Sequence, residues 1–346
     1  MLSGTLILFF GLTFFSLPFA KYQCSPGILL SRTKKRLVFS FAMVVFSNRL
    51  TSYITHFTNN QKNLLEKTQY CYDRKEYDYK KDNEKDGLLM YKGIAFFDLD
   101  HTLYNEHTRV DAEVADAMHQ LKANNILPVI STGRNLFEIP DTMKKTGIDT
   151  VVYANGSYVI FEGKPVYKAL LDKSVVKTFV DFAKSNHEAT TVMNSQGAKI
   201  NFINDIVRGN YNFINSRMPN LGVDDFIEHQ EVIMMLINTK GPDERYIDRF
   251  ADTLTFFRNT PFSMDIVHKG SSKKKGIQEL IANANLSGIP TYAFGDGNND
   301  IPMLDFVDHP VVMENGLPHV KEYAEFITTK NTDHGIVNGL KHFGLL

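Results

Sequence analysis

The chain has 346 residues, of which 43% are hydrophobic, with 38 lysines and arginines against 39 aspartates and glutamates. This length allows two domains, each with its own core. The balanced charge gives no indication of a nucleic-acid partner or of a surface that attracts acidic substrates. Its only two cysteines, Cys24 and Cys71, precede the main body. A disulfide framework is therefore not expected, and the body suits a reducing compartment.

The segment 1–89 carries no recognisable chemistry. An apolar, uncharged stretch at 2–20 is long enough to span a bilayer or to form the core of a signal sequence, although it lacks the basic residues that should precede such a core and has a poor cleavage site. A second apolar patch at 37–46 is too short to span, and 61–87 has the composition of a solvated linker. Three interpretations are open: a membrane anchor through residues 2–20, a cleaved targeting segment, or a native start at Met90. The last is typical of single-domain enzymes and implies a cytoplasmic protein.

Two carboxylates follow the first buried strand of the main body. The apolar run 93–97 is too short for a helix and is typical of a strand buried on both faces. In an extended chain, Asp98 and Asp100 point to the same side, above the carboxyl edge of the sheet, where open α/β folds place their ligands. Two close carboxylates repel each other, and a hard cation such as Mg²⁺ relieves that repulsion. An ordinary polar turn after a strand would show the same local pattern.

Further strand–helix–strand units predict a parallel sheet with right-handed crossovers. The strand at 126–130 ends in Ser131-Thr132-Gly133-Arg134, where a hydroxyl group and a helix N-terminus can bind a phosphate, or simply form a helix cap. A third strand ends in Asn155-Gly156. The elements expected in this part are a helix from about 108 to 125, strands at 126–130 and 150–154, and a hairpin at 158–167.

Beyond Leu171 the pattern changes to helices interspersed with alternating strands, which predicts a compact α+β insert with its own core. We place this insert at 172–264, between core segments at 90–171 and 265–346. It carries no glycine-rich loop, metal cluster or catalytic triad. Its expected elements are a helix at 175–183, strands at 190–193, 199–203 and 231–237, a helix from Asp243 to about Leu254, and a strand at 262–267.

The return to the core supplies a lysine-rich loop and a pair of aspartates next to glycines. Lys273-Lys274-Lys275 lies at the start of a predicted helix, where basic charge opposes the helix dipole unless an anion binds there; a solvated loop is the alternative. The strand at 291–294 ends in the run 295–300, Gly-Asp-Gly-Asn-Asn-Asp. Its glycines let the backbone turn sharply and bring Asp296 and Asp300 close to a metal. The segments expected to complete the sheet and its cover are 310–313, the vicinity of Val320, 326–328 and 336–343.

These four stretches, in this order and with the insert between the second and the third, resemble the pattern of the haloacid dehalogenase superfamily, specifically its Cof-type phosphatases with a large C2 cap. The resemblance covers about Met90 to Leu346. It implies an α/β fold, a Rossmann-like parallel sheet core with an inserted α+β C2 cap domain. It also implies a Mg²⁺-dependent phosphatase that hydrolyses small phosphomonoesters, such as sugar phosphates, through an aspartyl-phosphate intermediate.

The resemblance also assigns roles to individual residues. Asp98 is the implied nucleophile, and Asp100 is the implied general acid and then general base, with its backbone carbonyl facing the metal. The implied magnesium site comprises Asp98, Asp100, Asp296 and Asp300. The implied substrate contacts are Thr132, Gly133, Asn155, Lys273 and Asn299.

Two positions depart from the family pattern. The family usually has glycine after the second aspartate, where this chain has His101, so we expect altered loop geometry without loss of activity. The family also commonly has a phosphate-binding lysine followed at once by glycine. Lys273 has the expected spacing from Gly270 and from the apolar Ile277, whereas Lys275 precedes Gly276 but places Glu279 at the apolar position. We choose Lys273.

Other functions compete with the phosphatase hypothesis. A phosphomutase would use the same two aspartates and return the phosphoryl group to a substrate, and a non-catalytic sensor would only bind a phosphosugar. A P-type ATPase is disfavoured, because such proteins carry threonine where Asp100 stands and need many membrane-spanning helices. The insert is expected to close over the site and select the leaving group. Its candidate contacts are Phe202, Arg208 and Tyr211, which could equally be core residues.

Overall fold

The computed structural model describes residues 91–346. The expectations for the N-terminal segment, including the apolar stretch, the linker, both cysteines and a start at Met90, concern residues outside this range. Among the described residues, no helix combines the length and apolar character needed to cross a bilayer.

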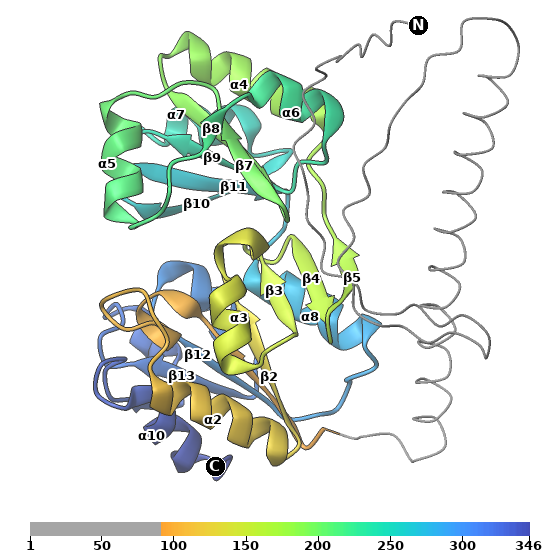
Figure 1. The fold of residues 1–346 in the computed structure, drawn as a ribbon, viewed down its shortest axis with the longest axis vertical. Coiled ribbons are helices and arrows are strands. Elements are labelled where there is room, and N and C mark those ends of the chain that lie inside the picture. Colours follow the sequence, from red (N-terminus) through yellow and green to blue (C-terminus); the bar gives the residue numbers. More distant parts are fainter. Residues whose placement is uncertain (1–90) are drawn as a thin grey trace, which may run out of the picture. The chain divides into compact units, whose positions relative to one another are not determined.

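The larger of two sheets, here called the core sheet, has eight strands in the order β14-β13-β12-β1-β2-β3-β4-β5. The strands from β14 to β3 are parallel, and β4 and β5 form an antiparallel hairpin at one edge. Because β1 pairs with β12, segments from opposite ends of the described chain lie side by side (Figure 1). The predicted parallel sheet is confirmed. Its strands are β1 Gly93–Phe97, β2 Ile126–Ser131, β3 Val151–Tyr153, β4 Tyr158–Phe161, β5 Lys164–Lys168, β12 Thr291–Gly295, β13 His309–Met313 and β14 Phe326–Thr328.

Helices cover both faces of the core sheet and enclose two apolar clusters. In β1, Ala95 and Phe97 face one cluster, whereas Ile94 and Phe96 face the other, as the alternation of a strand requires. Burial of both faces explains why this strand is continuously apolar. On the first face lie α2 Ala112–Ala123, α3 Pro140–Thr146 and α10 Gly335–His342, and on the second lie α8 Lys273–Asn283 and α9 Ile301–Leu304.

The smaller sheet has six strands in the order β10-β11-β9-β6-β7-β8 and is mainly antiparallel, and it fits a cap domain. We call it the cap sheet (Figure 1, green to cyan). One face packs its own apolar cluster around Phe179, whereas Met193 and Met234 on the other face join a core-sheet cluster. Its elements are α4 Lys173–Ser185, β6 Ala189–Asn194, β7 Gly197–Ile200, α5 Asp205–Phe213, β8 Asn220–Leu221, α6 Val223–His229, β9 Met234–Asn238, α7 Glu244–Phe250, β10 Leu254–Thr260 and β11 Ser263–His268.

The insert contains more secondary structure than the sequence predicted. The helix expected from Asp243 to about Leu254 ends at Phe250, and the unpredicted strand β10 begins at Leu254. Helices α5 and α6 and strand β8 were also not predicted. In α5 the buried face carries Asn210 and Tyr211 beside Val207, so polar atoms obscure the apolar period that would reveal a helix.

The return from the insert to the core comes later than expected. The boundary predicted between residues 264 and 265 falls inside β11. This strand pairs with β9 from Ser263 to Ile266 and with β10 as far as His268, so all of it belongs to the cap sheet. An apolar strand after an α+β insert has the same sequence pattern in either sheet, and the pattern alone does not identify its partners.

Helix α8 lies directly against the chain that follows β3. Gly156 has a φ of +84°, and a Cβ atom there would lie only 1.9 Å from the carbonyl oxygen of Ser272. A Cβ atom on Gly276, within α8, would lie 2.8 Å from the Cα atom of Gly156. This glycine contact brings Lys273, the first residue of α8, to the carboxyl edge of the core sheet.

This close approach predicts an unusually costly alanine substitution. Gly156→Ala should lower the free energy of unfolding by about 2–4 kcal/mol, because left-handed backbone strain adds to a clash with a backbone carbonyl. Gly163→Ala is the matched control, since Gly163 has a φ of +78° but nothing within 4 Å of its Cβ position. The control should lose only about 1 kcal/mol. Urea unfolding followed by circular dichroism measures both, and equal losses would contradict the close packing.

Candidate active site

Four adjacent parallel strands of the core sheet end beside one another, and each is followed by polar residues. The strands lie in the order β12, β1, β2 and β3, so their carboxyl ends share one edge of the sheet. The predicted site residues at this edge are Asp98 and Asp100 after β1, Thr132 and Gly133 after β2, Asn155 after β3, and Asp296, Asn299 and Asp300 after β12. Residues scattered over the sequence therefore meet at one place.

Lys273 joins two of these carboxylates in a buried ion cluster. Its Nζ atom lies 2.5 Å from Oδ1 of Asp98 and 2.6 Å from Oδ1 of Asp300. The lysine side chain is fully buried, and the two carboxylates are almost so. Asp296 lies next to them, because one carboxylate oxygen from each of Asp98, Asp296 and Asp300 falls within 4.8 Å of the other two. Lys275, in contrast, pairs with Glu279 on the exposed side of the same helix.

The charges in this cluster shift the pKa values of its members. Burial lowers the pKa of the Lys273 ammonium group, but Asp300 and Asp98 outweigh that effect and raise it, so the lysine is charged. Burial raises the pKa of Asp98 well above its usual range, and Lys273 opposes this while the neighbouring carboxylates reinforce it. Burial, reinforced by Asp300, raises the pKa of Asp296 to about 7.

The cluster has the oxygen ligands and the excess of negative charge that a divalent cation site requires. Three close carboxylates face one ammonium group, so negative charge exceeds positive charge in a buried place. Carboxylate oxygens are the hard ligands that Mg²⁺ binds. The residues present therefore fit Mg²⁺, with Asp98 and Asp296 as the ligands that the surrounding hydrogen bonds leave most available.

Asp300 differs from the other two because both of its oxygens are already in use. Oδ1 accepts from Lys273, and Oδ2 accepts from the backbone N–H groups of Asp296 and Gly297, each at 2.9 Å. A Cβ atom on Gly295 would lie 2.7 Å from the Asp300 carboxylate, which explains the glycine there. Asp300 thus holds both the loop that carries Asp296 and the lysine.

Asp100 is not one of these three close carboxylates and pairs with Arg134. Nε of the arginine lies 2.8 Å from Oδ2 of Asp100, and Nη2 lies 2.7 Å from Oδ1, a two-bonded pair that fixes both side chains. Burial lowers the pKa of Arg134, but the bond to Asp100 outweighs it and raises the pKa. The Asp100 carboxylate is therefore not among the three that could hold a metal. Arg134 is the last residue of the predicted motif 131–134, but the sequence indicated no role for it.

His101 occupies a left-handed turn directly after Asp100. Its φ of +59° is a conformation that glycine adopts freely, so the chain forms the turn in spite of the substitution. The backbone carbonyl of His101 accepts a hydrogen bond of 2.9 Å from Nδ2 of Asn315. This contact with a distant loop fixes the turn.

The remaining predicted residues form a hydrogen-bonded wall. Oγ1 of Thr132 accepts from the backbone N–H of Arg134 at 3.1 Å, which leaves the hydroxyl proton able to donate to a ligand. The buried Asn155 donates to Oδ2 of Asp265 at 3.0 Å and accepts from Nδ2 of Asn299 at 3.2 Å. A Cβ atom on Gly133 would contact the Asn155 amide at 3.1 Å, so the wall requires a small residue there.

Asp265 was not predicted as a site residue. It lies in β11 of the cap sheet and reaches the core sheet through its bond with Asn155. The signal available in the sequence was an acidic residue within an apolar strand, which is uncommon unless its charge has a partner.

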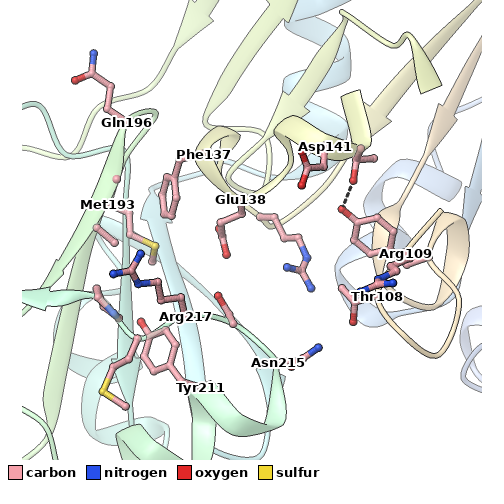
Figure 2. Close-up of a pocket in the computed structure, with 18 of the residues that line it drawn as sticks. Thr108, Arg109, Phe137, Glu138, Asp141, Met193, Gln196, Tyr211, Asn215 and Arg217 are labelled. Carbon is pink, nitrogen blue, oxygen red and sulfur yellow. Dashed lines mark hydrogen bonds between the residues drawn. The ribbon is translucent and has the colours of Figure 1, made fainter. Parts of the chain in front are cut away.

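A cavity of about 1020 Å³ lies between residues of the core sheet unit and residues of the cap sheet unit. Figure 2 shows Met193, Gln196, Tyr211 and Arg217 on the cap side and Thr108, Arg109 and Asp141 on the core side. Arg134 also lines the cavity, which places this part of it beside Asp100. Of the three cap residues predicted as substrate contacts, Tyr211 lines the cavity, whereas Phe202 packs into a cap cluster and Arg208 lies elsewhere on the surface.

Comparison with known proteins agrees with this geometry. A family model described as haloacid dehalogenase-like hydrolase matches residues 95–340, well over half of the chain. The chain belongs to this family. The resemblance inferred from the four motifs is therefore confirmed.

Individual proteins match this chain over almost their whole length, and those with solved structures have the same fold. A hypothetical protein from Geobacillus kaustophilus is 30% identical with a TM-score of 0.68, over 73% of this chain and 99% of that one. The subclass IIB sugar phosphatase BT4131 is 26% identical with a TM-score of 0.65, over 73% of this chain and all of the other. The Bacillus subtilis protein named "Putative phosphatase YkrA" is 27% identical over 259 residues, 74% of this chain and all of the relative. This haloacid dehalogenase-family protein is a phosphatase.

The raised pKa of Asp296 predicts a pH-dependent stability in the absence of divalent cations. Its folded pKa of about 7 exceeds the ordinary 3.8, so between these values the folded state holds a proton that the unfolded chain has released. Stability should therefore fall as the pH rises from about 4 to about 7, and this group should contribute little further change above that. Thermal unfolding in a chelator measures this, and Asp296→Asn should reduce the dependence. An unchanged dependence in the variant would contradict the assigned pKa.

Proposed function

We propose that this phosphatase hydrolyses small phosphomonoesters, such as sugar phosphates, in a Mg²⁺-dependent reaction through an aspartyl-phosphate intermediate. The observation that carries the proposal is the buried cluster in which Lys273 contacts Asp98 and Asp300 beside Asp296. Such a cluster can hold a nucleophile, a cation and phosphoryl oxygens together. A relative with known structure is described as a sugar phosphatase, which supports sugar phosphates as the substrate class.

In the first half-reaction, a carboxylate oxygen of Asp98 attacks the phosphorus atom and the bond from phosphorus to the ester oxygen breaks. Asp100 donates a proton to the departing oxygen as an alcohol forms. Lys273 and the Thr132 hydroxyl hold the phosphoryl oxygens while negative charge spreads over them. Asn299 supports the same oxygens, and Gly133 and Asn155 line the entrance.

In the second half-reaction, a water molecule attacks the phosphorus atom of the aspartyl phosphate. Asp100, now ionised, takes a proton from that water, and inorganic phosphate leaves as the Asp98 carboxylate re-forms. The two bonds from Arg134 suit this step, because they fix the position of the Asp100 carboxylate.

Magnesium bound by Asp98 and Asp296, with the backbone carbonyl of Asp100, would neutralise charge between the nucleophile and the phosphoryl group. Asp300 supports this site by fixing Lys273 and the backbone around Asp296. The insert acts as a cap of the C2 type that excludes water. Its predicted range was 172–264, and the pairing of β11 extends it to the end of that strand.

Substitution of the nucleophile tests the covalent mechanism. Asp98→Asn keeps the size of the side chain and an oxygen that accepts from Lys273, but it removes the attacking carboxylate. Release of inorganic phosphate from p-nitrophenyl phosphate in Mg²⁺ should fall by at least about 10³-fold, while binding of a phosphomonoester, measured by calorimetry, persists. Turnover near the wild-type rate would contradict the aspartyl-phosphate route. Turnover that requires a bisphosphate activator and releases no net phosphate would instead indicate a mutase.

The two neighbouring lysines provide a matched test of the phosphate site. Lys273→Met should lower kcat/KM for p-nitrophenyl phosphate by at least about 10³-fold and should destabilise the fold by about 3 kcal/mol, because buried carboxylates lose their partner. Lys275→Met removes only an exposed pair with Glu279 and should retain activity within about twofold. Steady-state kinetics and circular dichroism measure both variants. Equal losses would show that Lys273 has no special role.

A further inference from the structure

The cavity beside the proposed phosphoryl site is lined by more cationic than anionic side chains, and the reaction uses only one of these cations, Arg134. Its charged lining residues are Arg109, Arg134, Lys145 and Arg217 against Glu138 and Asp141. Arg134 is paired with Asp100, and Lys145 donates to the backbone carbonyl of Val110. Glu138 accepts from the backbone N–H of Asn135 at 2.8 Å and lies next to Arg134. These three charged residues therefore already have partners within the cavity wall.

Arg109 and Arg217 remain exposed to the cavity. Among residues 91–346, neither guanidinium group has a hydrogen-bond or ion-pair partner, and each side chain is solvent-exposed. Arg217 comes from the cap side and Arg109 from the core side (Figure 2), so an occupant of the cavity would meet donors from both. Asp141 is the one exposed carboxylate in the lining, and it offsets only one of the two positive charges.

The lining of the cavity also suits a carbon skeleton. Arg134 marks the end of the cavity next to Asp100. Phe137, Met193 and Tyr211 also line the cavity and present apolar surface along it (Figure 2). Its volume of about 1020 Å³ is at the upper end of the range for small-molecule sites, roughly 300–1,000 Å³. A leaving group that fills it extends well beyond the ester.

We propose that the leaving group of the substrate carries a second anionic group, a carboxylate or another phosphate, which Arg217 on the cap side and Arg109 on the core side attract. Guanidinium groups form paired, charge-assisted hydrogen bonds with both kinds of anion. This inference rests on the proposed phosphatase function and specifies the substrate class of that site. It also accounts for two exposed arginines that line one cavity without a partner among residues 91–346.

Four substrates that share a six-carbon skeleton test the proposal. Glucose 6-phosphate has a neutral leaving group and glucosamine 6-phosphate a cationic one, whereas 6-phosphogluconate supplies a carboxylate and glucose 1,6-bisphosphate a second phosphate. At low ionic strength, kcat/KM for at least one anionic substrate should exceed that for glucose 6-phosphate by about 10-fold or more, and glucosamine 6-phosphate should be the poorest substrate. The better of the two anionic substrates identifies which group the arginines bind. The preference should shrink as salt screens the exposed charges.

Arginine variants separate this site from general charge effects. Arg109→Gln and Arg217→Gln should each reduce the ratio of anionic to neutral kcat/KM by about 3-fold or more, mainly through KM, and the double variant should bring it near 1. Arg208→Gln is the matched control, because Arg208 is an exposed arginine of the same insert that does not line the cavity, and its ratio should stay at the wild-type value.

Two results would overturn the proposal. One is a wild-type ratio below about 3 for both anionic substrates, which is less than one charge-assisted bond provides. The other is a ratio that the double variant leaves unchanged. In either case the phosphatase function stands if the wild-type protein releases phosphate from glucose 6-phosphate or p-nitrophenyl phosphate in Mg²⁺ and Asp98→Asn does not. Absence of Mg²⁺-dependent release from every ester would instead refute the proposed function itself.

Discussion

A single buried ammonium group, shared between two carboxylates, is the interaction on which the active-site structure depends. The Lys273 side chain is fully buried and contacts Asp98 and Asp300. A third carboxylate, Asp296, lies beside them. Burying charged groups costs more free energy than their mutual attraction usually returns. The cluster is therefore poorly explained as a source of stability. Its excess of negative charge instead fits the cation and the phosphoryl group of the proposed reaction.

The fold delivers Lys273 to that place by bringing a helix unusually close to the sheet. Gly156 and Gly276 remove the side chains that would separate α8 from the end of β3. Asp300 then ties the lysine to the loop after β12 through bonds at both of its oxygens. Three segments that are distant in sequence are thus joined by backbone contact and by one carboxylate, so an error in any of them would displace the ammonium group.

Much of the core and most of the candidate site could be predicted from the sequence. Buried parallel strands are continuously apolar, and their ends are marked by sudden polar residues, as at Asp98 and Asp296. The sequence also distinguished Lys273 from Lys275 as the buried lysine. Residues two apart in a helix differ by about 200° and face opposite sides, and the apolar Ile277 lies on the same side as Lys273. Lys273 is accordingly buried, whereas Lys275 pairs at the surface with Glu279.

The parts that sequence could not provide depend on contacts between distant residues. The bond between Arg134 and Asp100 joins two separate strand ends, and neither residue carries a local sign of the other. Asp265 reaches the site only because β11 pairs within the cap sheet and turns one face toward the core. A local pattern can identify a strand, but it does not specify which sheet the strand will join.

The side chain of Asn135 forms weak hydrogen bonds at the boundary between the two sheets. The buried amide of Asn135 donates across it to sulfur, 3.3 Å from Sδ of Met193 and 3.8 Å from Sδ of Met234. Thioether sulfur is a weak acceptor, and methionine side chains repack at low cost. The two halves are therefore joined at this point by weak hydrogen bonds, which the proposed movement of the cap would break at little cost in free energy.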